Sequence, residues 1–100
     1  MVVEKIYELS PIDGRKSFYG KARVYHSHDK KGKQEILVSY TTPVVIKEDG
    51  KLYKAKTKWT LENKWSQTTA RHIKAYCGLN RQEFYALPYF RWPIIESWED

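Results

Sequence analysis

The sequence predicts an α+β domain: a three- to four-stranded antiparallel sheet with one main helix packed on one face, then a short helix and an aromatic C-terminal tail. Three observations carry this prediction. Apolar and polar side chains alternate in several early segments, an Asp-Gly pair separates two of those segments, and the pattern changes to a helical period after Trp65. The 100 residues fit a single domain spanning residues 1–100.

The first strands are predicted from period-two alternation. Residues 2–9 alternate weakly and fit an edge strand, with a turn after them. Residues 18–25 form the next predicted strand, followed by a loop over the polar residues 26–33 and a second clear strand over residues 35–40. One face of the strand over residues 18–25 carries Phe18, Gly20, Ala22 and Val24, and the other carries Tyr19, Lys21, Arg23 and Tyr25.

The pair Asp49-Gly50 is the clearest local signal, because a two-residue hairpin turn needs positive φ at both central residues. This turn fixes the register of its strands, with Glu48 opposite Lys51, Ile46 opposite Tyr53, and Val44 opposite Ala55. One face of the hairpin then carries Val44, Ile46, Tyr53, Ala55 and Trp59, and the other carries Val45, Lys47, Leu52, Lys54, Lys56 and Lys58.

A helix is predicted over residues 65–79 from an apolar stripe of Ala70, Ile73 and Cys77. Ser66 or Thr68 can cap its start, and Gly78 suits its C-terminal cap. A second short helix follows, because Asn80 and Glu83 have capping-box spacing. One helix covers only one side of a sheet, so we expect the other side to be open and basic.

Charge and composition narrow the class of protein. The 18 Lys and Arg against 12 Asp and Glu give a net charge of +6, which attracts anionic partners. The basic residues concentrate in residues 14–33 and 51–74, whereas the last nine residues carry acids only. The single cysteine, the absence of a signal-peptide core and the absence of a long apolar run predict a cytoplasmic protein without membrane contact.

The open sheet face is the first candidate site. Lysine and arginine neutralise phosphates, and tyrosine rings stack on unpaired bases, so such a face is typical of single-strand binders. The alternative is a solvated face whose lysines keep the sheet soluble. The candidate residues are Tyr19, Lys21, Arg23, Tyr25, Lys47, Lys54, Lys56 and Lys58, together with Arg71 from the predicted helix, for which a structural role is the alternative.

Catalytic and metal chemistry find little support in the sequence. His26, His28 and Asp29 have metal-ligand residue types, but exposed loop residues explain them better, and we predict no metal and no cofactor. Cys77 lies on the apolar stripe near a helix C-terminus, where the helix dipole disfavours a thiolate. No nucleophile–histidine–acid motif or phosphate-binding glycine loop is visible, so we predict a protein that is not an enzyme.

The C-terminal tail is the second candidate contact surface. Residues 89–95 are too apolar to stay in solvent, and Trp92 and Trp98 lie beside Glu96, Glu99 and Asp100 in an acidic, aromatic end. Docking on its own domain is the simpler interpretation. A homodimer contact or a partner contact is the alternative, because tryptophan carries much of the binding energy in protein interfaces.

Three segments of the chain stand out together: residues 17–22 (SFYGKA), residues 39–44 (SYTTPV) and residues 66–73 (SQTTARHI), the last preceded by a tryptophan. In this combination they resemble a family of small proteins encoded largely by phages, prophages and other mobile elements, which is catalogued as a domain of unknown function. The resemblance covers a core of residues 17–74. Residues 79–100 resemble an extension beyond that core, and residues 28–33 a longer loop.

The resemblance implies an accessory protein that binds a host protein or nucleoprotein complex, and we expect it to inhibit that complex in the cytoplasm of a bacterial host. Inhibitors of bacterial immunity, including anti-CRISPR proteins, come from this kind of source. The basic charge opposes plain DNA mimicry, which needs an acidic surface. The alternative function is a module that binds RNA or DNA directly through its basic sheet face.

Overall fold

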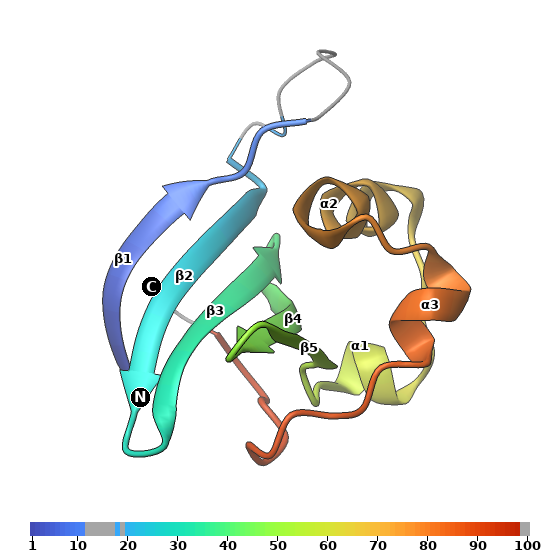
Figure 1. Cartoon of the computed structure of the whole chain (residues 1–100). Helices are drawn as coiled ribbons and strands as arrows, with labels where there is room; N and C mark the ends of the chain where they lie inside the picture. The colour runs from blue at the N-terminus through green and yellow to red at the C-terminus, as the bar shows by residue number, and fades with distance from the viewer. Residues whose placement is uncertain (12–17, 19, 99–100) are drawn as a thin grey trace.

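An antiparallel meander of five strands forms the body of the protein (Figure 1). The computed structural model describes residues 1–11, 18 and 20–98. The strands follow one another in chain order across the sheet. They are β1 (Val2–Glu8), β2 (Ala22–Asp29), β3 (Gly32–Ser39), β4 (Thr42–Glu48) and β5 (Lys51–Lys54). The α+β class is confirmed, with five strands in place of the three or four that the sequence predicted.

Three helices follow the sheet: α1 (Lys58–Leu61), α2 (Gln67–Cys77) and α3 (Arg81–Tyr85). The predicted caps of α2 are confirmed, since the Ser66 side chain accepts from the Thr69 N–H and Gly78 adopts the left-handed conformation with φ 76°. The capping box predicted for Asn80 and Glu83 starts α3. Sequence reasoning missed α1, whose capping box joins Thr57 to Thr60.

The two faces of the sheet carry separate apolar clusters. On the face that we call the helix side, α2 and α3 cover the strands through Ile73 and Phe84. The helices gather along that side in Figure 1. The opposite face, called the tail side here, is covered by the C-terminal tail through Phe90, Trp92 and Trp98. The sheet residues at the two cores are Val24, Leu37 and Val45 on the helix side, and Tyr25, Ile36 and Ile46 on the tail side.

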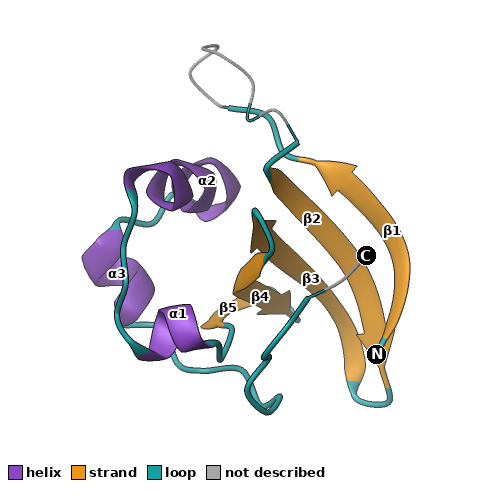
Figure 2. Cartoon of the chain, turned by 180° about the vertical axis from the view of Figure 1, so that it is seen from behind, coloured by secondary structure: helices purple, strands orange, loops and turns teal. Residues whose placement is uncertain are grey.

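The tail runs back along the sheet after α3. It pairs with β5, where the Lys54 N–H donates to Pro88 (2.8 Å) and the Phe90 N–H donates to Lys54 (2.9 Å). Seen from behind, it passes over β3 towards β2 (Figure 2). There the Trp98 ring meets the Tyr25 ring edge to face, with centroids 5.1 Å apart. Docking of the tail on its own domain is therefore confirmed, and the expectation of an open second sheet face is wrong.

The predicted hairpin register is confirmed at both pairs that the structure describes within strands, Glu48 with Lys51 and Ile46 with Tyr53. The turn has positive φ at Asp49 (52°) and Gly50 (75°), as the Asp-Gly pair predicts. The predicted faces need a correction at Val44. An irregularity between β3 and β4 turns Val44 to the helix side together with Val45.

Two further expectations about the strands are corrected. The predicted strand over residues 18–25 begins only at Ala22. The predicted loop over residues 26–33 is a long hairpin, in which β2 continues to Asp29 and β3 starts at Gly32. Polar residues belong to these strands because they satisfy one another: the buried Ser27 hydroxyl donates to the Gln34 side chain (3.1 Å).

Candidate functional site

The predicted basic face does not exist as one surface. Opposing residues of antiparallel strands project to the same face, so pairing assigns each residue a side. Tyr25 pairs with Ile36, which in turn pairs with Ile46, so all three project to the tail side. Lys54 pairs with Val45, and Lys47 pairs with Glu35, on the helix side. The expectation that these tyrosines and lysines project together is therefore wrong. The predicted hairpin register did not show which face of the hairpin lies on the same side of the sheet as Tyr25.

Two of the predicted contact residues are buried. Tyr25 is 1% exposed beneath Trp98, and Lys54 is 8% exposed. The Lys54 ammonium donates to the Tyr85 carbonyl (2.9 Å) and lies 4.3 Å from the centre of the Tyr89 ring. Burial lowers the pKa of Lys54 from its usual value. This lysine joins β5 to α3 and the tail and is not available to a partner.

The remaining hairpin lysines are spread over the molecule. Lys47 is exposed on the helix side of β4. Lys56 is half-buried, and its carbonyl accepts from the Ile95 N–H of the tail (2.8 Å). Lys58 is exposed at the first residue of α1. Tyr19 lies outside the described residues.

The structure does bring three other predicted residues together. Lys21 directly precedes β2 and Arg23 is its second residue, and both contact the Tyr40 backbone in the β3–β4 turn. The Tyr40 N–H donates to the Lys21 carbonyl (2.6 Å), and Arg23 Nη2 donates to the Tyr40 carbonyl (3.5 Å). Arg71 reaches this region from α2, with its guanidinium carbon 5.3 Å from the centre of the Phe18 ring. We call Lys21, Arg23, Tyr40 and Arg71 the Tyr40 surface.

Tyr40 is the exposed aromatic residue of this surface. Its side chain is 45% exposed, although most of its neighbours on β3 are buried. Its backbone has φ 58°, a left-handed conformation that costs a bulky side chain energy. Residues held in such conformations concentrate at binding and catalytic sites, where the surrounding structure imposes them. From the sequence, Tyr40 is predicted as the end of a strand and as part of the family-like segment 39–44, but not as a contact residue.

A buried polar cluster supports the Tyr40 surface from below. His72 of α2 is fully buried, and its Nδ1 lies 2.7 Å from the Ser39 hydroxyl, which in turn lies 2.9 Å from the Thr69 hydroxyl. The His72 ring contacts Phe18 (4.6 Å between centroids) and Tyr40 (5.8 Å). Burial, followed by the nearby Arg71 charge, lowers the pKa of His72 to about 4. His72 is therefore a core residue of α2.

The three segments that carry the family resemblance meet at this cluster. Phe18 belongs to the first, Ser39 and Tyr40 to the second, and Arg71 and His72 to the third. Phe18, Ser39 and His72 are each more than 20 residues apart along the chain but are in contact in space. A combined motif of this kind is the one sequence signal that indicated the site.

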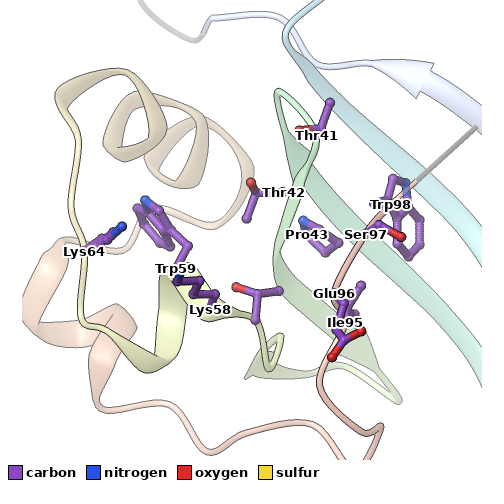
Figure 3. Close-up of a pocket in the computed structure, with 11 residues that line it drawn as sticks. Thr41, Thr42, Pro43, Lys58, Trp59, Lys64, Ile95, Glu96, Ser97 and Trp98 are labelled. Atoms are coloured by element: carbon purple, nitrogen blue, oxygen red, sulfur yellow. The ribbon is translucent and has the colours of Figure 1, made fainter.

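A cavity of about 240 Å³ begins one residue beyond Tyr40 (Figure 3). Trp59 and Lys64 lie on its α1 side, and Trp98 lies on the opposite side, with Thr42 between them. Its volume is below the range of about 300–1,000 Å³ that small-molecule sites usually occupy. The cavity therefore adds hydroxyl and ammonium groups next to the Tyr40 surface without forming a closed ligand site.

A carboxylate cluster at the β2–β3 turn holds the tail in place. Arg91 donates to Asp29 (2.9 Å) and to Glu48 (2.7 Å), and the Trp92 indole N–H donates to Asp29 (3.0 Å). The Trp92 hydrogen bond, with further hydrogen bonds and the Arg91 charge, holds the pKa of Asp29 well below its usual range. Trp92 is therefore a docking residue of the chain itself, and Asp29 is its partner.

Groups that could hold a metal ion or act as nucleophiles are scarce in the part of the chain that the structure describes. It contains no cluster of three or more His, Cys, Asp or Glu side chains with metal-binding geometry. His28 Nδ1 lies 2.6 Å from Glu4 instead. Cys77 is half-buried, and burial raises the pKa of its thiol, which disfavours the reactive thiolate.

Together, the sheet, the helices and the Tyr40 surface define a small α+β protein with an exposed tyrosine and three basic residues at one end of its sheet. The chain belongs to a family of unknown function (DUF8033), whose sequence model matches residues 7–86. The match includes the predicted core and α3 and leaves the tail outside. No curated protein and no solved structure matches the chain. None of the described helices has the length and apolar character needed to cross a membrane.

Proposed function

We propose that the chain is a non-enzymatic binding protein that contacts the single-stranded nucleic acid of a host nucleoprotein complex through the Tyr40 surface. The observation that carries this proposal is the exposed Tyr40, held at φ 58° with its backbone bonded to Lys21 and Arg23. Arg71 lies on Phe18, which joins Tyr40 through the His72 ring. A tyrosine face stacks on a base of any sequence, and neighbouring cations neutralise the phosphates on either side.

The biological role within this proposal is that of a phage or mobile-element accessory protein that inhibits the complex it binds. The resemblance in residues 17–74 and the small size of the chain support that role. The net charge of +6 favours contact with bound nucleic acid over mimicry of it. An anti-CRISPR-like inhibitor of bacterial immunity is one function of this kind.

Fluorescence anisotropy with a labelled, unstructured RNA or DNA strand tests the contact. The double variant Lys21→Glu/Arg71→Glu should weaken binding at least tenfold. It should also lower the slope of log K against log salt by roughly 1–1.5, since each contacted phosphate contributes about 0.7 for single strands. Both side chains are exposed, so the variant should keep its fold, as checked by circular dichroism.

The matched control is Lys47→Glu/Lys51→Glu, which makes the same change of charge at two exposed positions towards the opposite end of β4. It should weaken binding less than threefold. Equal losses in both double variants would show non-specific attraction to a basic protein and would reject the Tyr40 surface. A partner that the wild-type protein captures from host lysate equally well after nuclease treatment would show protein recognition instead.

A further inference from the structure

The outer edge of β1 is unlike the opposite edge of the sheet. The edge at β5 is covered by the tail through the hydrogen bonds of Lys54 with Pro88 and Phe90. Strand β1 pairs only with β2 among the described strands, and all seven of its residues are exposed. An uncovered edge presents a row of backbone N–H and C=O groups that another strand can pair with.

The side chains on this edge are also unusually apolar for a surface strand. Val2, Val3, Ile6 and Tyr7 are 55%, 39%, 44% and 37% exposed. Edge strands are usually protected by charged residues and bulges, and β1 has both, in Lys5 and in an irregularity at Glu4. A partner strand must therefore pair with β1 in a register that accommodates Lys5 and the irregularity at Glu4.

The irregularity at Glu4 sets which way the β1 side chains point. Pairing with β2 places Val2, Lys5 and Tyr7 on the helix side, opposite His28, His26 and Val24. It places Val3 and Ile6 on the tail side, opposite Ser27 and Tyr25. Glu4 belongs to the helix side, because it contacts His28 there at 2.6 Å.

Strand β1 is self-complementary in one antiparallel register. When Glu4 faces Lys5 of a second copy, Val3 faces Ile6 and Val2 faces Tyr7. Each pair then lies on one side of the joined sheet, as antiparallel pairing requires. In a register shifted by one residue, two Glu4 or two Lys5 side chains lie opposite each other. The same shift sets tail-side Val3 against helix-side Lys5 or Tyr7.

We infer that the protein forms a two-fold symmetric homodimer through β1, in the register that pairs Glu4 with Lys5 of the second copy. The two five-stranded sheets become one continuous sheet of ten strands. Two opposite-charge pairs and four apolar pairs cross the symmetric interface, as expected for an isologous contact. The Glu4 carboxylate is 49% exposed and uses only Oε1 towards His28, so Oε2 remains for Lys5 of the second copy.

Sedimentation equilibrium with charge-swap variants tests this dimer. Glu4→Lys and Lys5→Glu each place like charges across both pairs, and each should weaken dimerisation at least tenfold. The double variant Glu4→Lys/Lys5→Glu restores opposite charges and should recover the dimer to within about threefold of the wild-type dissociation constant. A wild-type protein that is still monomeric at about 100 μM would overturn the inference. So would a folded double variant that stays monomeric where the wild type is a dimer.

A cross-linking experiment tests the register independently of charge. In a Cys77→Ser background, Val3→Cys/Ile6→Cys should form a disulfide-linked dimer under mild oxidation, because the two positions face each other across the interface. Each single variant should stay unlinked, because position 3 of one copy does not face position 3 of the other, and position 6 does not face position 6. Cross-linking of the single variants as readily as the double variant would show a different register.

Discussion

Tyr40 combines an unfavourable backbone conformation with an exposed ring. A left-handed conformation costs an ordinary L-residue about 1–2 kcal/mol, whereas Asn tolerates it better. In this turn the Tyr40 backbone is held from both sides, by the Lys21 carbonyl and by Arg23. A position selected for its backbone conformation alone would favour Gly or Asn, so we attribute the tyrosine to its ring, which contacts His72 and which we propose binds a base.

Replacing Tyr40 by Asn should therefore separate stability from binding. We expect Tyr40→Asn to raise the free energy of unfolding by roughly 0.5–1 kcal/mol, measured by urea denaturation, because the strain is reduced. The same variant should bind single-stranded nucleic acid about five- to tenfold more weakly, because stacking of one base is lost. Tyr40→Phe keeps the ring and should retain the wild-type affinity. A destabilised Tyr40→Asn variant with unchanged affinity would contradict both arguments.

Prediction from the sequence worked for individual residues wherever a local rule decided the conformation. Asp49, Gly50, Ser66 and Gly78 adopt the turns and caps that their residue types predict. Tyr25 shows the limit of such rules. Alternation assigned it correctly to the same side as Arg23, but whether that side is covered depends on a tail more than 60 residues away.

Secondary-structure elements were predicted less evenly. The hairpin at Asp49-Gly50 and the long helix were found because their signals are strong and local. Helix α1 was missed because it has only four residues, too few to show a helical period. The extension of β2 and β3 was missed because polar residues replaced the apolar alternation, and the hydrogen bond between Ser27 and Gln34 is visible only in space.

The tail is an element without secondary structure of its own that depends on a few polar contacts. The Asp29 carboxylate accepts from Arg91 and from Trp92. These two residues lie in the sequence between Phe90 and Ile95, whose backbone amides donate to the carbonyls of Lys54 and Lys56. Replacing Asp29 by Asn keeps the size of the side chain and removes its charge. We expect the amides of Phe90 and Ile95 to exchange with solvent at least tenfold faster in Asp29→Asn, measured by NMR hydrogen exchange.

Asp49→Asn is the matched control for that experiment. It makes the same change of charge one residue after Glu48, and Asn tolerates the positive φ of 52° at that position. Exchange of the two tail amides should stay within about twofold of wild type in this control. Unchanged exchange in Asp29→Asn would show that the apolar contacts of Trp98 and Phe90 hold the tail without the carboxylate.

For the whole molecule, the sequence predicted the class of fold but not the sides of the sheet. Sidedness depends on two non-local facts: which helices and tail cover each face, and where irregularities at Glu4 and Val44 reset the alternation. For the same reason, the residues of the predicted basic face lie on different sides of the sheet. Lys21 and Arg23 still contact Tyr40, and Arg71 contacts Phe18. The contacts among Phe18, Ser39, Tyr40 and His72 join these segments in one cluster.

This cluster makes the stability of the whole domain depend on pH. The pKa of His72 is lowered to about 4 in the folded state, against about 6.5 for an unperturbed histidine. Below pH 6.5 the unfolded chain binds a proton that the folded chain excludes, so the stability is complete above pH 6.5 and falls as the pH approaches 4. We expect wild-type protein to lose on the order of 1–2 kcal/mol of unfolding free energy between pH 7 and pH 5.

Urea denaturation at pH 7, 6 and 5 measures this loss, with His72→Asn as the comparison. Asn offers a polar atom near the position of Nδ1 to Ser39 but does not titrate, so the variant should be less stable than wild type at pH 7 and nearly independent of pH down to 5. The carboxylates of Asp29 and Glu48, whose pKa values are also lowered, lose their contribution mainly below about pH 4.5, since the unfolded groups titrate near 4. An equal pH dependence in both proteins would assign the loss to other groups and would show that His72 can be protonated without opening the cluster.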